Sequence, residues 1–270
     1  MKKPALSVII AGLMVFLLVS CMSEKDKFGK TWFYTYSNNT SWSNSNWKTN
    51  TSTSSSKDPV LTPVHFLNLQ KNGRYTCYFS DFEYGTWTYQ NNTIVLKSNG
   101  RRERTLAVHS ISDKELCMDI DPANKDNNNY CFEGLPDPYT NEADDPFSAE
   151  NNQWRIKATA KESNDAVRKR LLNHFRYWEK YFSWGLKTDR QSLDVRSLPG
   201  PLKLYGNGFE LLPLDKWPDE WRSHFYDEEN VQQAYDMLHT FFSSQQIAWP
   251  KTDHKFKQFI SAFQQLQQKL

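Results

Sequence analysis

The spacing of apolar residues divides the chain into an apolar start, a stretch of period two and a stretch of helical period. Ala5 to Ser20 carries no charged residue and is dominated by Val, Ile, Leu, Met and Phe. Between Phe28 and Gly134 apolar and polar residues alternate in short runs, which predicts half-buried β-strands. From Trp154 onward apolar residues recur three and four positions apart, which predicts amphipathic helices.

About eight short strands are predicted in the period-two part, most of them joined by two-residue turns. An Asn-Gly turn such as Asn72-Gly73 between alternating runs is a strong hairpin signal. The pattern is typical of an up-and-down antiparallel β-barrel. The residues expected to point inward are mostly bulky, which favours an interior filled by side chains. They are Tyr75, Cys77, Phe79, Trp87, Tyr89, Val95 and Leu106.

Residues 28–134 resemble the bacterial lipocalin-like domains of secreted lipoproteins. Gly29-Lys30-Thr31-Trp32 resembles the Gly-x-Trp opening of lipocalins, with one extra residue. The resemblance implies a lipocalin-like barrel and transfers no ligand-binding residue. The other matching positions are Asn72-Gly73, Gly85-Thr86-Trp87, Ile94 to Leu96, and Ile111-Ser112 with Leu116.

The C-terminal part predicts a small domain of three or four helices. Ser163 is a plausible cap of the first helix. The second helix opens on Asp227-Glu228-Glu229, where acids favour the amino end. The third is expected to start at Pro250. Residues 197–221, rich in Pro and Gly, predict an irregular excursion that leads into a short helix at residues 218–226.

Residues 135–153 hold three prolines and five acids but no Lys or Arg, which predicts an extended connector. The chain is therefore expected to combine β and α domains. The expected division is a lipoprotein signal peptide at 1–20, a tether at 21–27, a lipocalin-like barrel at 28–134, an acidic Pro-rich linker at 135–153 and a helical domain at 154–270.

Cys21 marks the point where the apolar start meets a charged segment. The apolar run follows Lys2 and Lys3, is short for a bilayer span and suits a secretory signal. Leu18-Val19-Ser20-Cys21 resembles the lipobox of bacterial lipoproteins. The resemblance implies that the chain is cut before Cys21, that its sulfur carries a diacylglyceryl group and that its amine receives a further acyl chain such as palmitate. An ordinary cleaved signal or an uncleaved anchor is the alternative.

The residues after Cys21 bear on the membrane that holds the protein. Met22-Ser23 lacks the aspartate that, by resemblance to enterobacterial lipoproteins, retains the product in the inner membrane. The expected location is therefore the outer membrane, on its periplasmic face or at the cell surface. Residues 23–27 are interpreted as a solvated tether, with a surface-export tag as the alternative.

Three further cysteines are expected in an oxidising compartment. Cys117 and Cys131 flank a loop rich in Asp and Asn, and they are expected to form a disulfide across a hairpin while Cys77 stays buried and free. The sequence contains no Cys-x-x-Cys, so no metal site is expected.

No catalytic constellation is visible, so the protein is not expected to be an enzyme or to hold a cofactor. The sequence contains no His-Glu-x-x-His, no Gly-x-Ser-x-Gly and no phosphate-binding Gly loop. His174 and His239 are interpreted as core or boundary histidines, and Arg168 to Arg170 as a solvated helix face. The net charge is +2 with Lys and Arg spread along the chain, which gives no indication of nucleic-acid binding.

Two functions remain. The first is an interaction or structural accessory lipoprotein that has a filled barrel and docks other envelope proteins. The second is a binding protein for a small apolar ligand at the barrel mouth. Trp42 and Trp47 lie in a polar segment where no core needs them. They are expected either to contact a ligand or partner, or to fold back onto the barrel.

Overall fold

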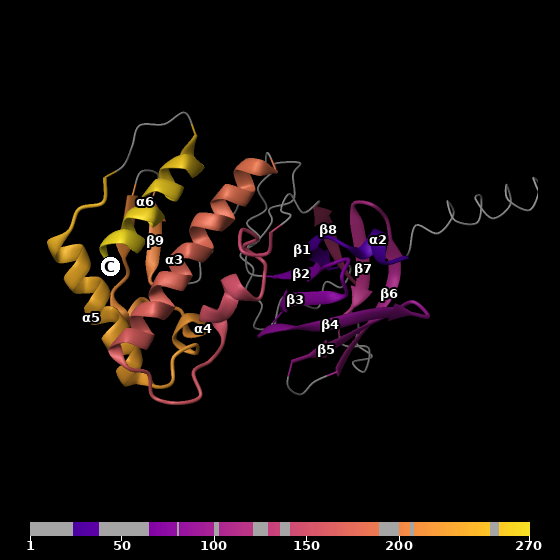
Figure 1. The fold of residues 1–270 in the computed structure, drawn as a ribbon, viewed down its shortest axis with the longest axis horizontal. Helices are drawn as coiled ribbons and strands as arrows, with labels where there is room; N and C mark the ends of the chain where they lie inside the picture. Colours follow the sequence, from indigo (N-terminus) through magenta and orange to yellow (C-terminus); the bar gives the residue numbers. More distant parts are fainter. Residues whose placement is uncertain are drawn as a thin grey trace, which may run out of the picture.

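The computed structural model places a β-barrel beside a group of helices (Figure 1). It describes residues 24–37, 65–79, 81–99, 103–120, 129–135, 141–188, 200–205, 208–248 and 254–270. The predicted signal peptide and Cys21, Trp42 and Trp47 lie outside the described residues. None of the helices in the described part of the chain combines the length and apolar character that crossing a membrane requires.

Eight antiparallel strands form a closed barrel in which neighbours in the chain pair and β1 pairs with β8. This arrangement confirms the predicted barrel followed by helices. A short helix, α2 (Glu24–Phe28), precedes the barrel and ends on the buried ring of Phe28. The strands are β1 (Thr31–Ser37), β2 (Phe66–Leu69), β3 (Arg74–Tyr78), β4 (Phe82–Gln90), β5 (Thr93–Ser98), β6 (Glu103–Ile111), β7 (Glu115–Asp119) and β8 (Asn129–Leu135).

The turn between β4 and β5 sets which residues of β5 point inward. Asn91 and Asn92 have positive φ angles of 51° and 56°, which the Asn side chain tolerates. With this two-residue turn Tyr89 pairs with Ile94, and Ile94 belongs to the interior cluster. The prediction that Val95 points inward is wrong, because its neighbour occupies the inner face and successive side chains alternate between faces.

Bulky side chains occupy the inside of the barrel. Most of them are fully buried, and the two largest are Trp32 and Trp87, which are 0% and 1% exposed. The predicted inward residues other than Val95 all belong to this cluster or pack against it. The buried members are Phe28, Trp32, Leu67, Leu69, Tyr75, Cys77, Phe79, Trp87, Ile94, Leu96, Leu106, Leu116, Met118, Tyr130 and Phe132.

The predicted long helices are α3 (Asn164–Lys187), α5 (Glu228–Ser244) and α6 (Lys255–Lys269). Ser163 caps α3 by accepting a hydrogen bond from the Ala166 N–H, as predicted. Asp227 caps α5 in the same way. The third helix begins at Lys255 with His254 as its cap, later than the predicted start at Pro250, which lies outside the described residues. The short helix is α4 (Asp219–Arg222), and the 3₁₀ turns are η2 (Glu150–Arg155) and η4 (Leu214–Lys216).

A β-hairpin lies where the sequence predicts an irregular excursion. Strand β9 (Leu202–Tyr205) pairs with β10 (Gly208–Leu211) in an antiparallel two-stranded sheet. The short alternating runs on either side of Gly206-Asn207 carry the same signal as the barrel hairpins.

Residues 141–156 are folded, which differs from the expected extended connector. Asn151 donates its side-chain amide to the Asp145 carbonyl at 2.7 Å, and Asn152 donates to the Pro146 carbonyl at 2.7 Å. The Asp145 carboxylate accepts a hydrogen bond from Asn68 on β2 at 2.9 Å. These bonds satisfy buried polar groups that would otherwise oppose the burial of the segment.

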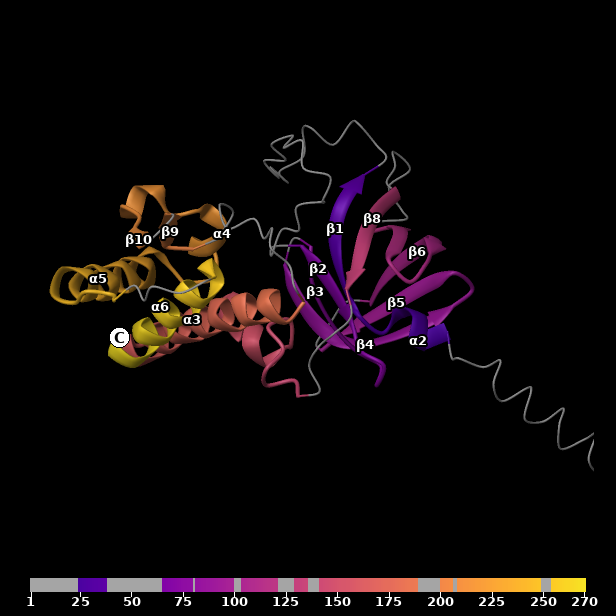
Figure 2. The same cartoon turned by 90° about the horizontal axis from the view of Figure 1, so that it is seen from above.

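Phe147 joins the barrel to the helices. Its ring centroid lies 5.0 Å from those of Phe33 and Phe66 on the outer wall of the barrel, and 5.2 Å from that of Trp184 on α3. Both views show the barrel and the helices side by side, with β2 and β3 on the side of the barrel that faces the helices (Figure 1, Figure 2). One apolar cluster therefore includes residues of both parts. We call this junction the seam: it consists of Phe33, Phe66 and Tyr78 of the barrel, Phe147 and Trp154 of the connecting segment, and the helical residues of the same cluster.

Candidate functional sites

Trp32 fills the end of the barrel that α2 enters. Its Nε1 donates a hydrogen bond to the Phe28 carbonyl at 3.0 Å, and its side chain is fully buried. Gly134 on β8 faces the indole, and a Cβ atom at that position would lie 2.5 Å from Trp32 Cζ3. The close approach therefore requires glycine. These contacts give the residue predicted by resemblance to the Gly-x-Trp motif a structural role.

The opposite end of the barrel contains an ion pair that faces inward. Arg104 Nη2 lies 2.6 Å from Glu83 Oε1, and the two side chains are 26% and 14% exposed. Glu83 is near the start of β4 and Arg104 near the start of β6. In an up-and-down barrel these starts lie at the same end. The guanidinium also lies over the Phe79 ring, 5.8 Å from its centroid.

The hydroxyl of Tyr75 and the thiol of Cys77 lie inside the barrel and interact with this ion pair. Burial raises the pKa of Tyr75 and of the Cys77 thiol, and the nearby Glu83 carboxylate raises both further. Both groups are therefore neutral at pH 7. A neutral buried thiol is a poor nucleophile, so Cys77, free as expected, gives no basis for thiol chemistry.

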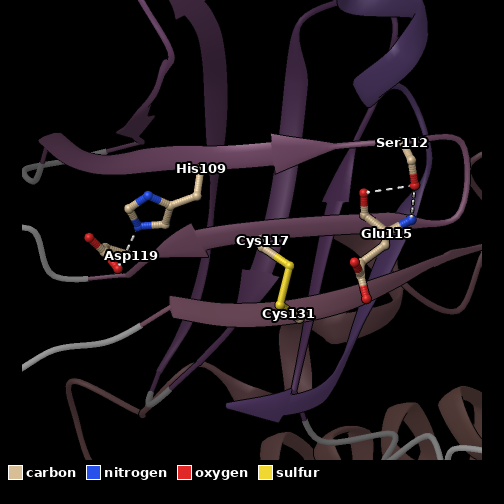
Figure 3. Close-up of a disulfide and its surroundings, with 6 residues drawn as sticks. All are labelled: His109, Ser112, Glu115, Cys117, Asp119 and Cys131. Carbon is tan, nitrogen blue, oxygen red and sulfur yellow. Dashed lines mark hydrogen bonds and ion pairs between the residues drawn. A yellow bond between two sulfur atoms is a disulfide. The ribbon is translucent and has the colours of Figure 1, made fainter. Parts of the chain in front are cut away.

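The sulfurs of Cys117 and Cys131 are bonded to each other across β7 and β8, and the two residues are 14 apart in the chain. They pair directly in the strand register. In Figure 3 the disulfide lies between Glu115 on one side and the His109–Asp119 pair on the other. Leu116 and Met118 belong to the interior cluster, so the alternation of β7 places Cys117 on the outer wall.

Glu115 lies beside this disulfide. Its carboxylate and the two sulfurs lie within 4.8 Å of one another, the one group of three metal-ligand types found this close within the described ranges. Because the sulfurs are bonded to each other, neither is a thiolate ligand. In this state the group offers a metal ion only the Glu115 carboxylate.

The seam contains two buried histidines, His174 on α3 and His224 after α4, which are 2% and 5% exposed. Burial lowers the pKa of His224 to about 3, and the charges of Arg155 and Arg170 contribute to the shift. Burial also lowers the pKa of His174 well below its usual value, and Arg155 adds to the effect. Both side chains are neutral at pH 7. Protonation of either imidazole is unfavourable because burial keeps water from solvating the added positive charge, which would also lie near the charge of Arg155.

Two sequence interpretations need correction. Arg170, assigned to a solvated helix face, is largely buried and pairs with Glu162 at 2.9 Å, each side chain being 10% exposed. Its Nη1 also donates to the carbonyls of Trp154 and Ile156, which attaches that segment to α3. His239, expected near an apolar face, is exposed and stacks on a tyrosine of α5. His174 is buried, as expected.

The fold defines a class of protein: a closed eight-stranded antiparallel barrel joined to helices, consistent with the lipocalin-like barrel predicted from the sequence. Comparison with protein-family models, curated proteins and solved structures gives no match.

Proposed function

We propose that the chain is a non-enzymatic lipoprotein of the bacterial cell envelope that acts as an interaction or structural accessory module. The observation that carries the proposal is the filled barrel, whose interior is taken up by its own buried aromatic and aliphatic side chains. A small eight-stranded barrel either encloses a ligand or is filled in this way. The protein would then act through the outer surface of the barrel and through the helices that pack on the barrel wall.

The envelope location and the lipid anchor are supported by two features. Leu18-Val19-Ser20-Cys21 follows an apolar run with a basic start, and acyl chains at Cys21 would hold the protein at the outer membrane. The disulfide between Cys117 and Cys131 is of a kind that persists in oxidising compartments such as the periplasm.

The second candidate function, binding of a small apolar ligand at the barrel mouth, receives less support. The end of the barrel opposite α2 contains the inward-facing charges of Glu83 and Arg104. An apolar ligand entering there would have to desolvate that ion pair, which opposes binding.

Replacing Trp42 and Trp47 together with Ala tests the interaction role. If the two indoles contact an envelope partner, the melting temperature should change by less than about 2 °C, since surface substitutions usually change stability by less than about 0.5 kcal/mol. Co-purification of cross-linked envelope proteins should fall at the same time. A loss of about 2 kcal/mol or more in stability would show instead that the indoles pack on the barrel.

Replacing Cys21 with Ala tests the anchor. The variant should accumulate as an uncleaved precursor or as a soluble form, because the sulfur that receives the diacylglyceryl group is missing. Membrane fractionation with intact-mass measurement checks this, and Cys77→Ala is the matched control because Cys77 is buried inside the barrel. A Cys21→Ala protein that still fractionates with membranes at its mature mass would refute the anchor.

A further inference from the structure

Arg155 is a buried cation in the seam. It is 3% exposed, and its guanidinium carbon lies 4.4 Å from the ring centroid of Tyr78, 4.2 Å from that of Trp154 and 4.9 Å from that of Tyr177. Nε donates to Asn152 Oδ1 at 3.0 Å. Nη1 and Nη2 are sealed from solvent and have no hydrogen bond of ordinary geometry, although the Tyr177 hydroxyl lies close enough to interact with the guanidinium.

The acids near these rings accept hydrogen bonds from other groups. The carboxylate of Asp145 accepts hydrogen bonds from Asn68 and from the Phe147 N–H, and Glu220 accepts one from the Tyr78 hydroxyl. Within the described ranges no carboxylate forms an ion pair with Arg155. The aromatic rings offset part of the cost of burying the cation, and the Tyr177 hydroxyl interacts with it. One hydroxyl does not supply acceptors for both terminal nitrogens, each of which carries two N–H groups.

Further unpaired polar atoms surround the same ring of Trp154. The indole Nε1 atoms of Trp154 and Trp221 and the Nδ1 atoms of His174 and His224 are all sealed and without a hydrogen bond. The Trp154 ring centroid lies 4.5 Å from that of His174, 5.7 Å from that of Trp221 and 5.4 Å from that of His224. These groups therefore form one cluster, and buried polar groups are ordinarily paired.

The chemistry of the cluster is dominated by donors. A guanidinium and an indole N–H can only donate. His174 Nε2 accepts a hydrogen bond from Trp178 Nε1 at 3.3 Å, so the proton of this neutral imidazole is on Nδ1, which is a donor as well. A ligand that complements these atoms must accept hydrogen bonds and carry negative charge.

We propose that this cluster, centred on Arg155 and the indoles of Trp154 and Trp221, binds one small oxyanion of the carboxylate or phosphate type. The two terminal nitrogens of the guanidinium match the geometry of two oxygens on one such group. Because the atoms are sealed from solvent, the anion reaches them only when the packing around Arg155 opens. Binding at the seam is a property separate from the proposed envelope role.

Thermal unfolding of the full chain tests the site, with formate and inorganic phosphate titrated separately and chloride adjusted to keep the ionic strength constant. A ligand that binds the folded state raises the midpoint in a saturable manner. Formate reports a carboxylate site, and phosphate reports a phosphate site. Arg155→Met, which keeps an unbranched side chain against the rings, should remove the saturable shift.

Trp154→Phe and Trp221→Phe each keep a ring and remove one N–H, so each should weaken binding by about tenfold. They decide the question if Arg155→Met does not fold. Arg176→Met, at an exposed arginine of α3, is the control and should match the wild type. The proposal fails if neither anion gives a saturable shift in the wild type, or if both Trp→Phe variants respond as the wild type does.

Discussion

Replacing Phe147 with Ala should lower the free energy of unfolding by about 3–5 kcal/mol. The ring is 1% exposed and contacts two barrel phenylalanines and two aromatic side chains of α3. Its removal leaves a cavity that neither the closed barrel nor the long helix can readily fill, because both are regular hydrogen-bonded elements. Urea unfolding followed by far-ultraviolet circular dichroism measures the change.

Phe242→Ala is the matched control for this experiment. Phe242 lies on α5, is only partly buried and packs at the edge of the same cluster. Its truncation should cost about 1 kcal/mol. If Phe147→Ala costs no more than this control, the seam does not stabilise the fold as the packing indicates.

Acid should destabilise the protein steeply below about pH 6.5, the usual pKa of histidine in an unfolded chain. His224 has a pKa of about 3 in the folded protein, and the pKa of His174 is also well below its usual value. Between about pH 3 and pH 6.5 the unfolded chain therefore binds protons at these histidines that the folded protein does not bind. The contribution of these histidines to the free energy of unfolding is therefore fully present above about pH 6.5 and is lost as the pH falls toward about 3. Each histidine contributes a slope of up to about 1.4 kcal/mol per pH unit.

Replacing His224 with Phe isolates one of these contributions. The variant keeps a ring against Trp154 and Trp221, and the slope of unfolding free energy against pH should decrease by about 1.4 kcal/mol per pH unit between pH 4 and pH 6. His239→Phe, at an exposed position of α5, is the control. Equal slopes for the His224 variant and the wild type would contradict a neutral buried imidazole at this position.

The barrel could be predicted because its signals are local. Turn residues such as Asn91 and Asn92 specify tight hairpins, and alternation specifies which residues of each strand face the core. The capping serine of α3 was recognisable for the same reason, since the N-cap bond spans three residues. The sequence does not predict the hairpin of β9 and β10, because Pro201 and Pro213 flank it and each strand is only four residues long.

The seam could not be predicted because it depends on contacts between distant parts of the chain. Residues 141–156 are rich in acids and asparagine, a composition typical of exposed connectors. Their amides instead bond to carbonyls of the same segment, which allows Phe147 to reach the barrel wall. The burial of Arg155 and Arg170 likewise follows from packing among η2, α3 and the barrel. The local signal is the pair of aromatic residues in this polar segment, Phe147 and Trp154, both of which are buried.

The central claim is that the barrel is filled by its own side chains, and titration with an apolar fluorescent probe whose emission rises in nonpolar surroundings tests it most directly. The account predicts a weak, non-saturable increase for the full chain, unchanged when Leu106 inside the barrel is replaced by Phe. Saturable binding of one probe per chain that Leu106→Phe abolishes, with the variant still folded by circular dichroism, would contradict it and favour a ligand-binding barrel.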